Sequence, residues 1–300
     1  MHKLEMMRVF VEAAECQSFV ETSRKLGLSA PAVTRSIAQL EHSLNVRLFN
    51  RTTRLVRLTD AGARYYDDAK HILELIEEAE AKTAGIYTEP KGTLSITAPV
   101  LFGQKHVVPI LTEYLQLYPA INARAMFYDR IGNILDEGLD VAIRIGHLKD
   151  SSQFATHVGN IQRIVCGSPK YFDQHGTPET PADLANHEII LASTVEPSTN
   201  WRFESSTGKE SVKVSQRLSC SQNGAAISAV KSGFGITRLM SYQVGEELQE
   251  GSLVRILRDY ESETLPVNII HLEGRHTNAK IRSFIDLAVE RLRENPYINH

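Results

Sequence analysis

The fold of the N-terminal region is decided by residues 18–59, SFVETSRKLGLSAPAVTRSIAQLEHSLNVRLFNRTTRLVRLT. Four apolar or small residues at helical spacing predict the buried face of a first short helix; they are Phe19, Thr22, Ser23 and Leu26. Gly27 is expected to end this helix in the left-handed region, because glycine adopts that conformation without steric cost. The turn that follows is therefore only a few residues long.

A second helix is expected to begin directly after this turn. Ser29 fits the N-cap, and Pro31 fits the first helical turn, where a missing N–H costs nothing. Asn45 fits the left-handed cap at the end. Helical spacing predicts one buried face, made of Val33, Ile37, Leu40 and Leu44. Four residues at the leading end lie off this face, where a recognition helix presents side chains to the major groove of DNA; they are Ala30, Ala32, Thr34 and Arg35.

Three arginines follow at a strict three-residue interval: Arg51, Arg54 and Arg57, with Thr52 and Thr53 between the first two. Planar guanidinium groups beside hydroxyls suit phosphate oxygens. A single arginine would be read as an ordinary surface charge, but three directly after this pattern indicate a basic hairpin that contacts the DNA backbone. The predicted DNA-binding residues are therefore Ser29, Ala30, Pro31, Thr34, Arg35, Arg51, Thr52, Arg54 and Arg57.

The segment resembles the winged helix-turn-helix of LysR-type transcriptional regulators, without a gap from Phe10 to Gly62. The matching positions are Phe10, Ser18, Phe19, Leu26, Ser29, Pro31, Ala32, Val33, Arg35, Ile37, Leu40, Glu41, Leu44, Leu48, Phe49, Arg51, Leu58, Thr59, Ala61 and Gly62. Two departures stand out. The family usually has two alanines where Thr22 and Ser23 stand, and a base-reading glutamine where Ala30 stands.

Length and charge agree with a DNA-binding module attached to a larger domain. A chain of 300 residues exceeds what one hydrophobic core usually organises, so two or more domains are expected. The net charge of −3 hides a segregation. Residues 1–60 hold nine Lys and Arg against six Asp and Glu, a net charge of +3, whereas residues 61–89 hold three against seven, a net charge of −4. The basic charge is thus local to the predicted DNA-binding region.

A long amphipathic helix is predicted from Thr59 to about Ile86. Its apolar positions alternate at intervals of four and three, which is the pattern of a seam between two helices; they are Tyr65, Ala69, Ile72, Ile76, Ala79, Thr83 and Ile86. A helix that lies on its own domain would be an alternative explanation. The resemblance implies that this segment is the dimerisation helix. Turn-forming residues at 85–92, GIYTEPKG, predict a domain boundary.

Beyond this boundary, strands and helices alternate, which predicts an α/β domain with a mainly parallel sheet flanked by helices. The order of elements resembles the two-lobed, periplasmic-binding-protein-like effector domain of LysR-type regulators. We therefore expect a winged helix-turn-helix at 1–59, a linker helix and hinge at 60–90, and an effector domain at 91–300. Lobe I would comprise about 91–165 and 265–300, and lobe II about 166–264.

Effectors of such domains are expected outside the carboxyl ends of strands, near the N–H groups that open helices. The candidate residues are Thr97, Pro99, Val100, Phe102, Tyr128, Arg144, Gly146, Ser193 and Asn223. Arg144 could pair with an effector carboxylate or form a structural ion pair. Phe102 and Tyr128 could be walls of the site or plain core. The expected partners are a double-stranded DNA operator, a small carboxylate or aromatic effector, a second copy of the chain in a homodimer or homotetramer, and RNA polymerase.

Enzymatic motifs were sought without success. The pair Gly233 and Gly235 lacks the third glycine of a dinucleotide-binding loop, because Arg238 stands there, and His187-Glu188 has no second histidine at metalloprotease spacing. No catalytic residue, metal site or cofactor is therefore predicted. Three scattered cysteines, at positions 16, 166 and 220, imply no disulfide framework, and no stretch has the apolar length of a membrane span. A cytoplasmic protein is expected. Two other classes were weighed, an exported solute-binding protein and a nucleoid-type DNA binder.

Overall fold

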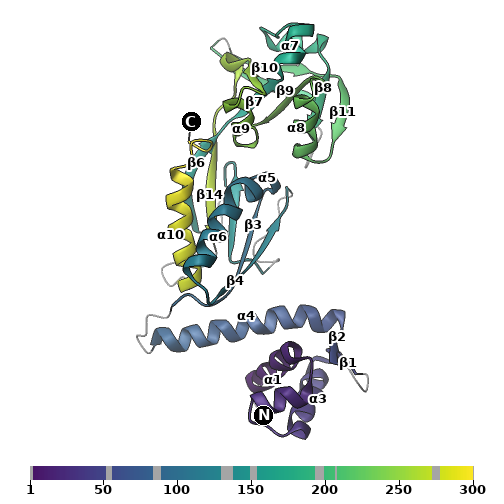
Figure 1. The fold of residues 1–300 in the computed structure, drawn as a ribbon, viewed down its shortest axis with the longest axis vertical. Helices are drawn as coiled ribbons and strands as arrows, with labels where there is room; N and C mark the ends of the chain where they lie inside the picture. The colour runs from purple at the N-terminus through teal and green to yellow at the C-terminus, as the bar shows by residue number, and fades with distance from the viewer. Residues whose placement is uncertain are drawn as a thin grey trace. The chain divides into compact units, whose positions relative to one another are not determined.

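The computed structural model describes residues 3–51, 56–83, 89–129, 138–148, 154–192, 199–206, 208–271 and 278–299 (Figure 1). Within these ranges, the side chains at 51, 75, 77–79 and 81–83 are outside the description. The chain divides into two compact units, Met1–Glu89 and Pro90–His300.

The N-terminal unit consists of four helices and a small hairpin. These elements are α1 (Lys3–Cys16), α2 (Phe19–Lys25), α3 (Ala30–Leu44), β1 (Phe49–Arg51), β2 (Val56–Leu58) and α4 (Asp60–Thr83). Their shared core is built around the rings of Phe10 and Phe49, whose centroids lie 5.3 Å apart. Ala69 and Leu73 of α4 belong to this core. The long helix therefore begins as part of the N-terminal unit.

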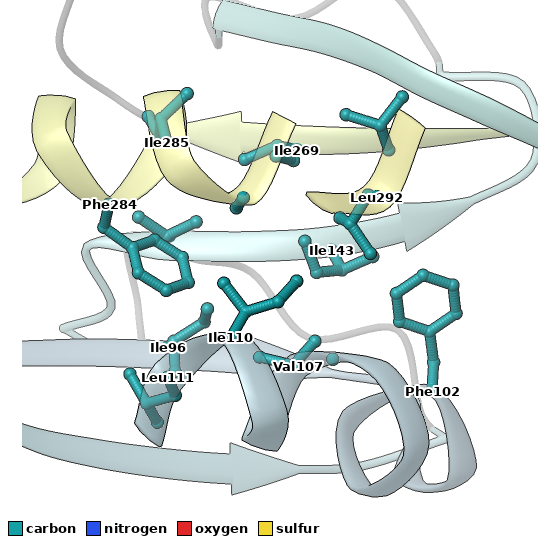
Figure 2. Packing of buried hydrophobic residues seen from close by; sticks show 14 of the residues in the cluster. Ile96, Phe102, Val107, Ile110, Leu111, Ile143, Ile269, Phe284, Ile285 and Leu292 are labelled. Carbon is teal, nitrogen blue, oxygen red and sulfur yellow. The ribbon is translucent and has the colours of Figure 1, made fainter. Parts of the chain in front are cut away.

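The first lobe of the C-terminal unit is a five-stranded sheet in the order β4-β3-β5-β14-β6. Its elements are β3 (Gly92–Ala98), α5 (Val100–Phe102), the π-helical turn η1 (Gly103–Val107), α6 (Val108–Leu117), β4 (Ile121–Phe127), β5 (Val141–Ile145), β6 (Phe154–Ile161), β14 (Leu265–His271) and α10 (Ala279–Arg293). Figure 2 shows Ile110 and Leu111 of α6 and Phe284 and Ile285 of α10 packed with strand residues such as Ile143. The C-terminal helix thus completes the first lobe.

The second lobe is a five-stranded sheet in the order β11-β8-β12-β7-β13, with a separate hairpin of β9 and β10. Its elements are β7 (Arg163–Gly167), α7 (Pro169–His175), η2 (Pro181–Asn186), β8 (Ile189–Ala192), β9 (Asn200–Ser205), β10 (Gly208–Lys213), β11 (Gln216–Cys220), α8 (Asn223–Lys231), β12 (Ile236–Met240), η3 (Ser241–Gln243), α9 (Gly245–Gln249), β13 (Val254–Ile256) and η4 (Arg258–Tyr260). Separate clusters of buried residues cover the two faces of this sheet.

Both sheets are mixed, so the prediction of a mainly parallel arrangement is wrong. In each sheet two strand pairs are parallel and two are antiparallel. The antiparallel pairs all involve β7 or β14, the strands by which the chain enters lobe II and returns to lobe I. These strands follow a change of lobe rather than a crossover helix within one sheet, so nothing forces them to run parallel.

The helix after β3 also begins earlier than predicted, at Val100 rather than Gly103. Gly103 has an ordinary helical conformation, and a Cβ atom there would lie 2.4 Å from the ring of Phe127. Glycine at this position therefore lets the helix pass close to the end of β4 and does not mark a helix start. The short helix predicted near 131–137 lies outside the described residues.

Candidate nucleic-acid interface and effector cleft

The turn between α2 and α3 has the local geometry that the sequence predicts. Gly27 has φ +64° and Leu28 N donates to Ser23 O at 2.9 Å, which closes α2. Ser29 Oγ accepts from Ala32 N at 3.3 Å, so Ser29 is the N-cap of α3. Asn45 has φ 51° and ends the helix in the left-handed region. All of these caps are made within the segment itself.

Thr22 and Ser23, which stand where the family usually has two alanines, both have their hydroxyl groups satisfied by hydrogen bonds. Thr22 Oγ1 donates to Ser18 O at 2.7 Å, and Ser23 Oγ donates to Val20 O at 2.7 Å. Both residues are buried in the contact between α2 and its neighbours. Hydroxyls bonded to the preceding turn can replace alanine in a buried helix face with little cost. Leu26, in contrast, was predicted on this face and is 36% exposed.

Helix α3 separates into a core face and a solvent face. Val33, Ile37 and Leu40 are fully buried. Thr34 and Arg35 are exposed at the leading end, as predicted. The solvent face continues with Ala38 and Gln39, which are exposed but were not among the predicted DNA-binding residues. Their spacing of four residues from Thr34 and Arg35 places them on the same face of the helix and could have indicated them.

The hydroxyl group of Thr34 is engaged within its own helix. Its Oγ1 donates to Ala30 O at 3.1 Å, one turn back in the same helix. A hydroxyl engaged in this way is not a free donor for a base edge, whereas the methyl group remains available for apolar contact with thymine. Ala30 is part-buried at the first position of the helix, and Pro31 beside it is exposed.

The wing is a short antiparallel hairpin in which Arg57 pairs with Asn50. Arg57 is exposed, and Arg51 lies in β1 with only its backbone described. Thr52 and Arg54 fall outside the described residues. Glu41 of α3 supports the hairpin, because its Oε1 accepts from Leu48 N at 2.9 Å and from Phe49 N at 3.1 Å. The carboxylate thereby couples α3 to the start of the hairpin.

The junction between the wing and α4 depends on Thr59 and Gly62. Thr59 Oγ1 donates to Arg47 O at 2.8 Å and accepts from Gly62 N at 2.9 Å. A Cβ atom on Gly62 would lie 2.0 Å from Leu48 O. No side chain fits there without moving the backbone, so glycine is required for the close approach of α4 to the wing.

The apolar positions predicted to form a helix-to-helix seam on α4 differ in how far the N-terminal unit itself buries them. Ala69 is fully buried in the core of the N-terminal unit, and Tyr65 packs against that core with its ring 5.3 Å from Phe10. The assignment of Ala69 to a dimer interface is therefore corrected, because the unit's own helices already cover it, whereas Tyr65 is part-buried and keeps some exposed surface. Ile72 is 41% exposed and Ile76 is part-buried. The side chain of Ala79 lies outside the description.

A polar contact on the same helix fixes α4 to α1. Glu15 Oε1 accepts from Lys70 Nζ at 2.8 Å and from Tyr66 Oη at 3.0 Å. Burial alone would lower the pKa of Lys70, but hydrogen bonds to Glu15 and Tyr66 outweigh burial and raise it. The hydrogen bond from Lys70 also lowers the pKa of Glu15. The pair is therefore charged at neutral pH.

Lobe I brings several of the predicted effector-site residues to one edge of its sheet. Strands β4 and β5 both run parallel to β3, so their carboxyl ends share that edge. Pro99 and Val100 follow β3, Tyr128 follows β4, and Arg144 and Gly146 lie at the end of β5. Tyr128 is 37% exposed and Arg144 is part-buried. In lobe II, Asn223 begins α8 and is part-buried, while Ser193 lies outside the described residues.

Two of the candidate residues at this edge are buried. Phe102 is 0% exposed, which agrees with the alternative that it is plain core, and Thr97 is 2% exposed, so its side chain is not open to a ligand at the strand end. The backbone N–H of Val100 was expected to be open to a ligand carboxylate, but it donates to Asp129 Oδ1 at 3.0 Å. A carboxylate of the chain itself therefore already lies at the start of this helix.

Comparison with known proteins identifies the two units. Residues 4–63 match the family described as "Bacterial regulatory helix-turn-helix protein, lysR family", and residues 88–293 match "LysR substrate binding domain". An HTH-type transcriptional repressor of Pseudomonas aeruginosa is 32% identical over 300 residues, covering 99% of this chain and 95% of that protein. The chain belongs to the LysR family of transcriptional regulators.

Solved structures of full-length family members are similar to the whole regulator. CrgA of Neisseria meningitidis is 30% identical, with a TM-score of 0.63 over 97% of this chain and 99% of that chain. The virulence activator AphB of Vibrio cholerae is 28% identical, with a TM-score of 0.61 over 97% and 99%. The family consists of transcriptional regulators with a helix-turn-helix DNA-binding domain and an effector-binding domain, and its members are not enzymes.

In the effector domain of this regulator, the two lobes touch beside the start of α6. The ring of Phe102 lies 5.1 Å from that of Tyr242 in η3, and Lys105 Nζ lies 3.1 Å from Glu246 of α9. His106 is 6% exposed between these contacts, and burial lowers its pKa to about 4. The ring of His106 is therefore neutral at pH 7 and does not oppose the neighbouring charge of Lys105.

Neither a metal cluster nor a membrane-spanning helix is present among the described residues of the regulator. Among the described residues, no cluster of three or more histidine, cysteine or acidic side chains is arranged to hold a metal ion. The described helices include none that is both long and apolar enough to cross a membrane. These two findings identify no additional binding chemistry.

Proposed function

We propose that this regulator reads its operator with the leading end and solvent face of α3 and holds the DNA backbone with the wing. The observation that carries this assignment is the exposure of Thr34 and Arg35 on a helix whose opposite face is fully buried. Ser29, Ala30 and Pro31 open that helix. Its first turn would lie against the groove, because recognition helices contact base edges with their N-terminal residues.

Arg35 is the residue we assign to direct base contact. A guanidinium that reads a guanine contributes about 1–3 kcal/mol of discrimination against the wrong base. We expect Arg35→Ala to weaken operator binding by roughly tenfold to a hundredfold and binding to random DNA much less. Fluorescence anisotropy with both DNA duplexes at fixed salt measures this. Equal losses on the two duplexes would make Arg35 a phosphate contact.

The matched control for this experiment is Arg282→Ala. Arg282 is an exposed arginine on α10, in the other unit of the chain. Its removal changes the net charge by the same amount and should leave both affinities nearly unchanged. The ratio of the two affinities also separates a sequence-specific regulator from a nucleoid-type binder, which would show little preference for any operator.

We also infer that the effector binds at the strand ends of lobe I and the start of α8 in lobe II, with Arg144 as the candidate cation and Tyr128 as a wall. The support is that β3, β4 and β5 end at one edge, the usual ligand position in open sheets. A small carboxylate or aromatic compound remains the proposed class. Because Asp129 occupies the N–H of Val100, a ligand carboxylate is expected at Arg144 instead.

A thermal-shift screen of small carboxylates and aromatics on the full chain tests this assignment, because a ligand that binds the folded state raises its stability by mass action. For any compound that binds, Arg144→Ala should lower the affinity roughly tenfold or more if the contact is direct. Unchanged affinity in a folded Arg144→Ala protein would demote Arg144 to a structural role.

The assembly we propose is a homodimer or homotetramer that uses the exposed part of α4. Ile72 and Ile76 are the apolar residues of the seam that the N-terminal unit leaves partly or largely uncovered. We place the regulator in the cytoplasm, where it would meet its DNA operator and RNA polymerase. Binding of an effector would shift the equilibrium between conformations that differ in DNA affinity.

A further inference from the structure

An arginine of lobe II is stacked on two aromatic rings and, among the described residues, has no acidic partner. Arg238 lies in β12, and its Cζ is 5.1 Å from the ring centroid of Trp201 and 5.9 Å from that of Phe203, both in β9. Both aromatic side chains are buried, at 3% and 4% exposure. The rings therefore hold the guanidinium at a fixed place over the hydrophobic cluster of this lobe.

Most of the hydrogen-bonding capacity of Arg238 is unused within the part of the chain that the structure describes. Its Nη1 donates to Arg202 O at 3.0 Å, which accounts for one of five N–H groups. Within the described part of the chain, Arg238 forms no ion pair with a carboxylate. Partly buried charges in proteins are normally paired, because removing a charge from water is costly.

A second arginine lies beside the first. In the antiparallel pairing of β7 and β12, Arg238 stands opposite Val165 and Met240 opposite Arg163, so the two arginines lie on one face of the sheet. Arg163 is exposed and, among the described residues, has no acidic partner either. Burial, and after it the charge of Arg163, lowers the pKa of Arg238 to about 10. Two like charges thus lie on one face of the sheet, and no carboxylate among the described residues is paired with either of them.

We propose that Arg163 and Arg238 form a binding site for an oxyanion, the carboxylate or phosphate group of a small molecule. An oxyanion between the guanidinium groups would supply the missing acceptor and offset their repulsion. Trp201 and Phe203 fix the position of Arg238, so little side-chain freedom is lost when the anion binds.

This site is separate from the effector position proposed above. Arg238 and Val165 share the sheet face covered by β9, as Val165 clusters with Trp201 and Phe203. Ile164 and Leu239 are next to Val165 and Arg238 in their strands, so their side chains lie on the opposite face of the sheet, where they pack with residues of α8. The helix that begins at Asn223 therefore lies across the sheet from the two arginines.

Trp201 is the only tryptophan of the chain, so its fluorescence reports on this site alone. The experiment titrates the full-length regulator with inorganic phosphate and, separately, with acetate, with sodium chloride adjusted to keep the ionic strength constant. A saturable change in Trp201 emission is expected with the anion that binds. Saturation with phosphate alone would assign the site to phosphate groups, and saturation with acetate would assign it to carboxylates.

Two variants and one control test the residues. Arg163→Gln leaves the stack of Arg238 on Trp201 intact, so its starting spectrum should match the wild type while its affinity for the anion falls on the order of tenfold. Arg238→Gln should abolish the saturable response. The control is Arg217→Gln, which removes an exposed arginine of the same lobe that is paired with Glu188 at 2.9 Å. It should bind as the wild type does.

Either of two results would overturn the proposal. One is a fluorescence change that never saturates with phosphate or acetate and matches the effect of chloride. The other is unchanged affinity in Arg163→Gln, with circular dichroism showing a native fold. If Arg238→Gln loses the fluorescence response because it misfolds, the Arg163→Gln result still tests the proposal, because that variant leaves the stack of Arg238 on Trp201 in place.

Discussion

Replacing Glu41 should release the wing from α3. One carboxylate oxygen of Glu41, Oε1, accepts hydrogen bonds from both Leu48 N and Phe49 N, at 2.9 and 3.1 Å. Hydrogen bonds to a charged acceptor contribute about 1.5–3 kcal/mol each, so two give about 3 kcal/mol at the lower limit. Glu41 is only part-buried, and water can replace part of this loss. We therefore expect Glu41→Ala to destabilise the local structure by about 1–3 kcal/mol.

Hydrogen exchange of the Leu48 and Phe49 amides measures this effect directly. A loss of about 1–3 kcal/mol corresponds to roughly 5-fold to 150-fold faster exchange at these two amides, since about 1.4 kcal/mol is a factor of ten. Glu41→Gln keeps an oxygen acceptor without the charge and should show an intermediate effect. Unchanged exchange at both amides in Glu41→Ala would refute the idea that this carboxylate holds the wing.

Three further outcomes are expected. Arg57→Gln should weaken binding to specific and random DNA alike and reduce the slope of log K against log salt by about 0.9, and an unchanged slope would rule out a phosphate contact. Gly62→Ala should destabilise the N-terminal unit by about 1–3 kcal/mol in thermal unfolding, because its Cβ would lie 2.0 Å from Leu48 O, whereas Gly224→Ala, with open space around its Cβ, should be nearly neutral. Ile72→Asp should convert the assembly to smaller species in light scattering, since it would bury an unpaired carboxylate in an apolar interface; an unaltered mass would exclude this part of α4 from the interface.

Features fixed by neighbours in sequence could be predicted from the residues. Gly27, Ser29 and Asn45 each occupy the cap position that their chemistry favours, because a cap involves only residues within one turn. The buried face of α3 followed from helical spacing in the same way. The same helical spacing placed Arg35 on the exposed face of α3, which is the feature that matters for the proposed DNA recognition.

Features that depend on distant contacts could not be predicted in this way. The heptad spacing of α4 specifies an apolar stripe but not what covers it, and Ala69 is covered by the chain's own core. Nothing local indicates that Glu15 reaches Lys70, 55 positions along the chain. Likewise, the alternation of strands and helices predicts an α/β domain, yet the direction of β14 depends on where the chain crosses between lobes.

The two lobes of this regulator differ in how they would receive an anion. In lobe I, the N–H of Val100 is occupied by Asp129, so any ligand carboxylate there would have to displace a carboxylate that is already tethered to the chain. In lobe II, Arg163 and Arg238 lie on one face of the sheet, and no acidic group of the described residues is paired with them. Displacing a tethered anion costs binding free energy, whereas filling a gap between two cations releases repulsion. The physical chemistry therefore favours an anion at the arginine pair over one at the helix start after β3.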